Sequence, residues 1–584
     1  MDSLTIHKTE THYYQFTEGP ARKSGVFNRR VQPYVTITDE DGSIAYEELG
    51  LGLMAAIVRQ DDTRALKEYL TNASWLIPRA PAIPPGLEEY STDIDYFHYA
   101  VHGGRLGVLK MLLAHGTGSE DPNPPTKIRF KEREYELLHI AARCGHLDMV
   151  KFLLENQPLY ADIHEQDFEG FSPIISAADC YPTDYLTPGI PGKASAARNE
   201  AVINLLLDRG ASASDVVPPM AEADKTSDTV LTLAAKWAGS ALLERLIERG
   251  ADVHAKVTKL DWQLTLWNSP GKTFEVDALF IACSVANFDA VKTLIDYSGV
   301  HTDAIHSRDS RGSLPIHWAT QNAVADGMSA FSAAIQQEKV QNITSIIGHL
   351  LDLDPTTVNA QDNIGNTPLQ YATRAFGRHD ELYSPVFKLI CDRGGDSSIR
   401  NDKGQTPLHT LFECDGVESD RVNSWCGTIA KDEPVIETSS IITLLAHGAK
   451  ATDVDDDGNT PLHYVAEILD YVNAVSVLLD HGADPTRRNS KQETALHRAA
   501  RGHYRPMDRW FNAEDRIEAQ EDVMARLIKV GGEGLMDQID AKGNCPRQLS
   551  EEQRNAWRKD DGPAWKRPPI HRPAAEIVEA VEKE

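Results

Sequence analysis

Asp456–Ser490 reads DDGNTPLHYVAEILDYVNAVSVLLDHGADPTRRNS, and the order of its parts decides the fold. Asp457 and Gly458 form a tight-turn pair. Pro461 follows at the first position of a helix, where the missing N–H of proline removes no hydrogen bond. Leu462, Val465, Ala466 and Leu469 then recur at helical spacing, and a second apolar run over 472–479 stops at Gly482. The stretch predicts a turn and two short helices, a unit of roughly 33 residues that cannot bury its apolar faces alone and must stack on a neighbour.

Copies of this unit lie on both sides of it. Gly365–Gln370 reads GNTPLQ, Gly404–His409 reads GQTPLH, and Lys491–Ala500 reads KQETALHRAA. The pattern resembles the ankyrin repeat, whose signature is a T-P-L-H-x-A run at a period near 33. This resemblance implies an all-α ankyrin-repeat solenoid of about eleven helix pairs with short β-hairpin fingers.

The start of each first helix carries the repeat motif, and we interpret its residues as structural. They are Thr367, Pro368, Leu369, Thr406, Pro407, Leu408, His409, Thr460, Pro461, Leu462, His463, Thr494, Leu496 and His497. The histidine rings are expected to bond neighbouring turn groups and to tie adjacent units together. Stacking spreads them along the solenoid axis, so they do not converge as metal ligands would.

The repeats fill most of the chain. Residues 1–46 contain no repeat and are expected to form an N-terminal arm or cap with a β-like run over 34–38. The solenoid is expected over 47–560, with insertions near 179–196, 254–275, 321–341, 413–435 and 502–521. Residues 561–584, which contain prolines and several glutamates, are expected to be a mobile acidic tail.

Charge and cysteine usage narrow the classes of function. The formal net charge is −28, from 87 acidic and 59 basic residues, which argues against direct binding of nucleic acid. The acidic surface either keeps the array in solution or attracts a partner with a basic surface. Seven cysteines without a C-x-x-C spacing favour neither a disulfide framework nor a zinc site. No signal pattern and no membrane-spanning apolar run are present, so we expect a cytoplasmic or nuclear protein.

No catalytic constellation is evident in the sequence. It lacks a phosphate-binding loop, a nucleophile elbow and an H-E-x-x-H pair, so no catalytic residue and no cofactor are assigned. No metal site is expected at His301 and His306, which lack a third ligand at suitable spacing. The acidic run at 453–457 does not continue as a calcium-binding loop.

Surface residues remain as candidates for binding a partner. Trp262 and Trp267 lie on a predicted long hairpin over 257–274, where they either contact a partner or pack against a neighbouring finger. Residues at finger tips can vary without affecting the stack, and those chosen as candidates are Phe168, Arg311, Asn363, Lys403 and Asp456.

We therefore predict a non-catalytic protein–protein interaction scaffold or adaptor that binds partners on a concave face of fingers and first helices. The resemblance to ankyrin-repeat proteins implies regulatory work, and transcription coregulation is a narrower alternative. The rival hypotheses are an enzyme whose pocket is built by the insertions and a passive spacer. The partner, the pathway and the oligomeric state stay open.

Overall fold

The computed structural model describes residues 4–7, 13–22, 32–38, 44–49, 57–73, 96–117, 137–157, 161–167, 170–180, 193–217, 227–260, 273–321, 333–376, 380–413, 438–469, 471–503 and 513–560. Two compact units can be separated, residues 1–259 with 292–297 and residues 260–291 with 298–584. Each is described by itself below.

The first unit begins with an antiparallel sheet in which the strands pair in chain order. Its strands are β1 (Leu4–His7), β2 (Tyr13–Arg22), β3 (Gln32–Thr38) and β4 (Ile44–Leu49). In the register of β2 and β3, Phe16 lies opposite Ile37. The β-like run at 34–38 is thus one strand of a meander, and the sequence analysis foresaw only this strand. That residues 1–46 act as an arm or cap stays a prediction.

Paired helices follow the sheet. They are α2 (Thr63–Ala73), α3 (Tyr96–His102), α4 (Leu106–Thr117), α5 (Leu137–Arg143), α6 (Leu147–Glu155), α7 (Pro173–Ala178), α8 (Lys193–Asp208), α9 (Val230–Ala234) and α10 (Ser240–Glu248). The first helices α3, α5, α7 and α9 pack on one another in sequence, and α6 packs on α8. Short strands β5 (Val216–Val217), β6 (Asp228–Thr229) and β7 (Val257–Leu260) lie in the connections.

The second unit repeats this two-layer arrangement. Its elements are β8 (Thr273–Val276), α12 (Ala278–Ser284), α14 (His301–Ile305), α15 (Pro315–Thr320), α16 (Ala333–Leu353), η4 (Pro355–Asn359), α17 (Pro368–Phe376), α18 (Asp380–Asp392), α19 (Pro407–Thr410), α20 (Ser439–Ala446), α21 (Pro461–Ala466), α22 (Val472–Asp480), α23 (Ala495–Ala500), α24 (Ala513–Gly531), η7 (Glu533–Asp537) and α25 (Pro546–Asp560). The boundary between the units falls within α13 (Phe288–Tyr297), whose residues 292–297 belong to the first unit.

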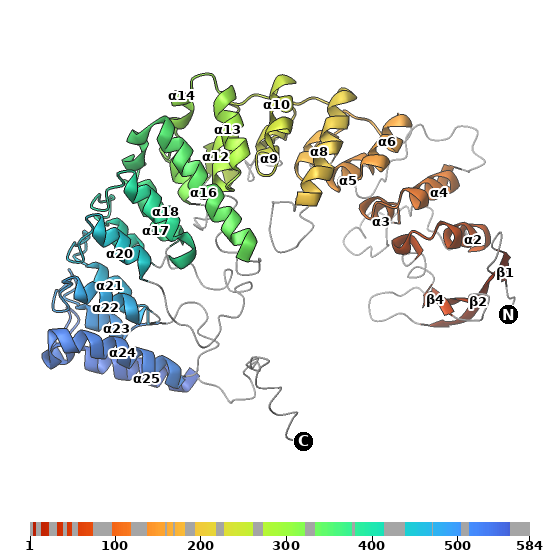
Figure 1. The fold of residues 1–584 in the computed structure, drawn as a ribbon. Helices are drawn as coiled ribbons and strands as arrows, with labels where there is room; N and C mark the ends of the chain where they lie inside the picture. The colour runs from red at the N-terminus through yellow and green to blue at the C-terminus, as the bar shows by residue number, and fades with distance from the viewer. Residues whose placement is uncertain are drawn as a thin grey trace. The chain divides into compact units, whose positions relative to one another are not determined.

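First helices form one layer of the second unit and second helices form the other. α12, α15, α17, α19, α21, α23 and α25 contact one another in that order, while α16, α18, α20, α22 and α24 do the same beside them. Figure 1 shows these helices following one another from α16 in green to α25 in blue. The all-α repeat solenoid predicted from the sequence is confirmed.

A thin apolar layer between the helices of each pair and their neighbours holds the stack together. Leu462, Val465, Val475 and Leu478 are each fully buried, and each such side chain contributes about 1.5–3 kcal/mol by leaving water. The core is therefore distributed along the chain, as stacking of small units requires.

The first helix of the repeat at Asp456–Ser490 ends earlier than predicted. α21 stops at Ala466, and Leu469 lies outside it although its side chain is fully buried. The Leu469 N–H donates to the carbonyl of His503 at 3.1 Å, and the His503 N–H donates to that of Glu467 at 2.9 Å. Pairing with the segment after α23 thus replaces the last turn of the expected helix.

Within the described ranges, no helix combines the length and the apolar character that crossing a membrane requires.

Candidate protein-interaction face

Each finger from residue 309 onward, a tight turn before a first helix, is closed by one aspartate or asparagine side chain. In the finger of residues 362–366, Asp362 Oδ1 accepts hydrogen bonds from the N–H groups of Ile364 (3.0 Å) and Asn366 (2.9 Å). Gly365 supplies the positive φ of +75° that the turn requires. The same pair of side-chain bonds is made by Asp309, Asn401, Asn489 and Asp540.

Backbone hydrogen bonds join each finger tip to the next in the second unit. The Asn363 N–H donates to the carbonyl of Arg311 at 2.8 Å, and the Asp456 N–H donates to that of Lys403 at 3.0 Å. Equivalent bonds run from Asp402 to Ile364 (3.1 Å), from Ser490 to Asp457 (2.8 Å) and from Ala541 to Lys491 (2.9 Å). The tips between residues 309 and 543 therefore form one continuous row.

Histidines at the start of the first helices connect each repeat to the following one. The Thr460 N–H donates to His463 Nδ1 at 3.1 Å, and His463 Nε2 lies 3.1 Å from the carbonyl of Glu493 in the next repeat. These are the two kinds of bond expected from the sequence. The other rings with a comparable bond to the next repeat are His139, His317 and His409.

Burial keeps these rings neutral. It lowers the pKa of His317 and His463 to about 4, and it also lowers the pKa of His409 and His497. Only a neutral imidazole can accept at Nδ1 while donating at Nε2, so the bonds of His317, His409 and His463 require the neutral form that burial favours. The rings are fixed joints between repeats.

Aromatic residues directly after this position anchor three of the fingers to their own first helices. Tyr371 Oη donates to Asp362 Oδ2 at 2.6 Å, and Tyr464 Oη donates to Asp455 Oδ2 at 2.7 Å. Trp318 Nε1 donates to the finger aspartate of its repeat at 3.0 Å. These three aspartates thus hold the turn with one oxygen and the helix with the other. The sequence carries a signal for this contact, an aromatic residue nine positions after the aspartate, which the predictions from sequence missed.

Four of the tip residues chosen from the sequence lie in the described row. Asn363 is exposed, the Lys403 side chain is 66% exposed with Nζ 3.0 Å from Glu413, and the Asp456 side chain is 67% exposed with its carboxylate 3.6 Å from Arg400. The row therefore brings these three side chains to one exposed edge of the second unit.

Arg311 differs from the other three because its side chain packs on its own repeat. The guanidinium lies over the Trp318 ring at 5.4 Å and 3.6 Å from the Asp309 carboxylate, and the side chain is only 23% exposed. Its use by a partner stays a prediction. Trp262, Trp267 and Phe168 lie outside the described residues, between β7 and β8 in the case of the tryptophans.

The ends of the first helices carry charges that pair between repeats. In the first unit, Arg143 at the end of α5 forms an ion pair with Asp179 after α7. In the second unit, Arg374 on α17 lies 3.8 Å from Glu413 after α19. Sequence reasoning missed this row. A charged residue four positions after the histidine position was the available signal.

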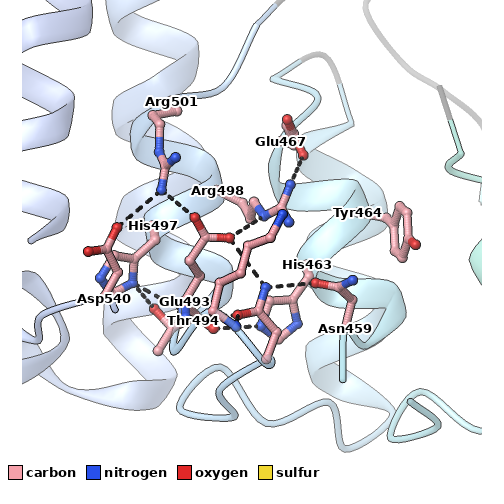
Figure 2. Close-up of polar contacts among 12 residues, drawn as sticks. Asn459, His463, Tyr464, Glu467, Glu493, Thr494, His497, Arg498, Arg501 and Asp540 are labelled. Atoms are coloured by element: carbon pink, nitrogen blue, oxygen red, sulfur yellow. Dashed lines mark hydrogen bonds and ion pairs between the residues drawn. The ribbon is translucent and has the colours of Figure 1, made fainter. Parts of the chain in front are cut away.

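Around Glu493 this row becomes a network (Figure 2). The Glu493 carboxylate is 7% exposed and contacts Arg498 Nε at 3.0 Å as well as Arg501. Arg498 also reaches Glu467 at 2.9 Å, and Arg501 lies 3.5 Å from Asp540. Burial raises the pKa of Glu493, but the two arginines and a hydrogen bond from Asn489 outweigh it, and the pKa lies below its ordinary value. The network links α21, α23 and the finger before α25.

The fingers and first helices thus form a face in which many buried polar groups bond to each other and the tip side chains of Asn363, Lys403 and Asp456 are exposed. We call residues 309–544 of the fingers and first helices the finger/first-helix face. In the part of the chain that the structure describes, no group of three or more His, Cys, Asp or Glu side chains could hold a metal ion. What this face offers another molecule is a rigid row of variable side chains.

Comparison with known proteins agrees with the repeat pattern. A family described as ankyrin repeats (3 copies) matches residues 53–186 and 436–508. The chain is similar to an intracellular phospholipase A2 of Caenorhabditis elegans, with 26% identity over 164 residues, which cover 27% of this chain and 13% of that protein. It is also similar to the poly(ADP-ribose) polymerase tankyrase of the same organism, with 34% identity over 120 residues (19% and 5%).

A longer stretch is similar to the putative ankyrin repeat protein L371 of Acanthamoeba polyphaga mimivirus, with 23% identity over 274 residues, 43% of this chain and 30% of that protein. The matched stretches thus span less than a third of the length of each of these relatives.

Proposed function

This chain is an ankyrin-repeat protein, and from that premise we propose that it is a non-catalytic scaffold or adaptor that binds partner proteins on its finger/first-helix face. Ankyrin repeats are a protein–protein interaction module. The observation that carries the proposal is the row of finger tips. Their backbones are joined by hydrogen bonds of 2.8–3.1 Å, while the side chains of Asn363, Lys403 and Asp456 are exposed.

A rigid row of exposed side chains favours binding because the row loses little conformational entropy on association. The cost of immobilising backbone and side chains is a main loss in protein binding, and a pre-organised surface reduces it. The tip residues also vary from repeat to repeat, which suits recognition of a specific partner rather than a repeated contact.

The proposal excludes catalysis by this chain itself. Two relatives carry the names of enzymes, a phospholipase and a polymerase, but the similarity covers 13% and 5% of their lengths. Their activities therefore belong to those proteins. The proposed partners are proteins rather than nucleic acids, and the proposed location is the cytoplasm, the nucleus or both. Regulation of transcription is a narrower form of the proposal that predicts a nuclear pool in cell fractionation.

Site-specific photocrosslinking tests the proposal. A photoreactive amino acid is placed at Asn363 on the finger, or at Lys388 on α18 of the same repeat, whose side chain is 69% exposed. In the native cell, the first variant is expected to form a discrete crosslinked product with a partner protein, and the second is not. Products from Lys388 with none from Asn363 would contradict the proposed face.

A further inference from the structure

Two neighbouring repeats of the finger/first-helix face carry opposite charge. Residues 453–467, a finger with its first helix, contain five acidic side chains and no lysine or arginine. Residues 487–501, the next finger and first helix, contain five basic side chains and one acidic, a net charge of +4. The preceding stretch 399–413 has two of each sign. The charge therefore changes from strongly negative to strongly positive over one repeat.

The two stretches lie side by side. α21 packs on α23, and the Ser490 N–H donates to the carbonyl of Asp457 at 2.8 Å, which sets the two finger tips next to each other. We call residues 453–467 the acidic strip and residues 487–501 the basic strip.

Near the helices the charges are paired within the basic strip and between the two strips, but at the tips they are not. Glu467 pairs with Arg498, and Glu493 pairs with Arg498 and Arg501. At the tips, Asp457 and Lys491 are exposed, and their side chains make no hydrogen bond or ion pair with any described residue. Charge available to another molecule is therefore concentrated at two adjacent tips of opposite sign.

We propose that these strips bind one extended segment of a partner protein in which a basic cluster is separated from an acidic cluster by about three residues. Neighbouring helices lie roughly 8–10 Å apart, and an extended chain advances about 3.3 Å per residue, which gives the separation. The basic cluster lies on the acidic strip and the acidic cluster on the basic strip. This inference rests on the proposed function and states the chemistry of the partner.

Charge order distinguishes this partner from a merely basic one. The whole chain has a net charge of −28 and would attract any polycation, with an attraction that depends on composition alone. A segment that matches both strips gains from the order of its charges, because like charges opposite each other are repelled. Two peptides of the same composition but different charge order are therefore bound differently only if the strips recognise the segment.

The test uses the full chain and fluorescein-labelled peptides in an anisotropy titration at low and at physiological salt. One peptide has three lysines, three glycine or serine residues and three glutamates, and the other has the same residues with lysine and glutamate alternating. We expect the segregated peptide to bind at least about tenfold more tightly than the alternating one, with a difference that narrows as salt is added.

Substitutions at the tips locate the effect. Asp457→Lys or Lys491→Glu is expected to remove most of the preference for the segregated peptide, and the double variant Asp457→Lys/Lys491→Glu restores part of it because the strips keep opposite signs at the tips. Glu518→Lys on the exposed surface of α24 is the matched control and leaves the preference intact. Unchanged thermal melting verifies that each variant is folded.

Equal affinity for the two peptides, or an equal loss in the Glu518→Lys control, would overturn the inference. Crosslinking of a partner through Asn363 combined with equal peptide affinities would refute only the charge-order recognition and leave the proposed function standing. Absence of crosslinking at Asn363 would count against the proposed function whatever the peptides do.

Discussion

At the scale of single residues, Gln370 and His463 hold the same position in two repeats and do the same work. Gln370 Oε1 accepts from the Thr367 N–H at 2.8 Å, and its Nε2 donates to the carbonyl of Gln405 at 2.7 Å. His463 accepts from Thr460 and bonds Glu493 in the same way. The position requires one acceptor and one donor at the right separation, and not an imidazole as such.

Replacing His463 by glutamine or by leucine tests whether the position requires the two hydrogen bonds or the imidazole ring itself. We expect His463→Gln to lower the free energy of unfolding by no more than about 1 kcal/mol, because both hydrogen bonds can be kept. His463→Leu leaves the Thr460 N–H and the Glu493 carbonyl buried without partners and is expected to cost about 2–5 kcal/mol. Urea unfolding followed by circular dichroism measures both, and equal losses would contradict the assigned role.

The same residue gives a pH dependence. The folded pKa of about 4 lies below the unfolded value of about 6.5, so the unfolded chain binds the proton first as the pH falls. Stability from the neutral ring is complete above about pH 6.5 and is lost towards pH 4. Asp455, Glu493 and Arg498 are the charged groups near the ring.

Between pH 6.5 and pH 5, His463→Gln should therefore lose less stability than the unsubstituted chain, by about 2 kcal/mol. This window lies above the range in which carboxylates with lowered pKa begin to titrate. Urea unfolding at several pH values measures the difference, and parallel pH profiles for the two proteins would exclude the buried neutral histidine as a source of acid sensitivity.

At this scale the sequence was informative where both partners lie within one motif. The Thr-Pro-Leu-His run predicts the bond from Thr460 to His463, because the two residues are always three positions apart. Pairs such as Arg374 and Glu413 could not be predicted, because their contact depends on how one repeat is placed on the next.

At the scale of elements, the finger is the part that depends most on its neighbours. Gly365 has a φ of +75°, and a Cβ at this position would lie 3.0 Å from the Cα of Asn401 and from the amide nitrogen of Asp402, both in the backbone of the next finger. Gly482 at the end of α22 has a φ of +87° and open space around it. Gly365 is thus required both by the geometry of its turn and by the contact between fingers, whereas Gly482 is required by the geometry of its turn alone.

Alanine at these two positions should have different costs. Gly482→Ala adds only backbone strain, about 1–2 kcal/mol, while Gly365→Ala adds strain and presses on the backbone of the neighbouring finger, for a total of about 2–4 kcal/mol. Thermal unfolding compares the two, and hydrogen exchange at the Asp402 amide, which donates to the carbonyl of Ile364 at 3.1 Å, reports the second effect. A larger loss for Gly482→Ala would contradict the close contact between fingers.

Element types could be predicted from the sequence more reliably than their ends. Helical spacing and the Pro and Gly boundaries identify α21 and α22, and the β-like run at 34–38 identifies β3. The early end of α21 could not be foreseen, since Leu469 keeps the helical spacing but pairs with His503 instead. The other strands of the N-terminal meander give a weaker signal, because only one of them has a clear run of β-branched residues.

At the scale of the whole molecule, the account depends on the face that the stack presents. The apolar layer between helix pairs accounts for the fold, and the tips play little part in it, so their chemistry is available for binding. Lys403 and Lys388 allow this division to be tested. Their side chains are 66% and 69% exposed, and each makes one ion pair, with Glu413 at 3.0 Å and with Asp392 at 2.6 Å.

The most direct measurement is the affinity of the crosslinked partner, determined by calorimetry, for chains carrying Lys403→Glu or Lys388→Glu. Lys388→Glu should leave the melting temperature within about 2 °C, because exposed ion pairs contribute at most about 1 kcal/mol. Lys403→Glu sets a second carboxylate beside Glu413, whose side chain is 12% exposed, so a lower melting temperature is expected and both affinities are measured well below it. The account predicts that reversing the charge at Lys403 weakens binding at least tenfold while reversing it at Lys388 has no effect. Equal affinities for the two variants, or a loss confined to Lys388→Glu, would contradict it.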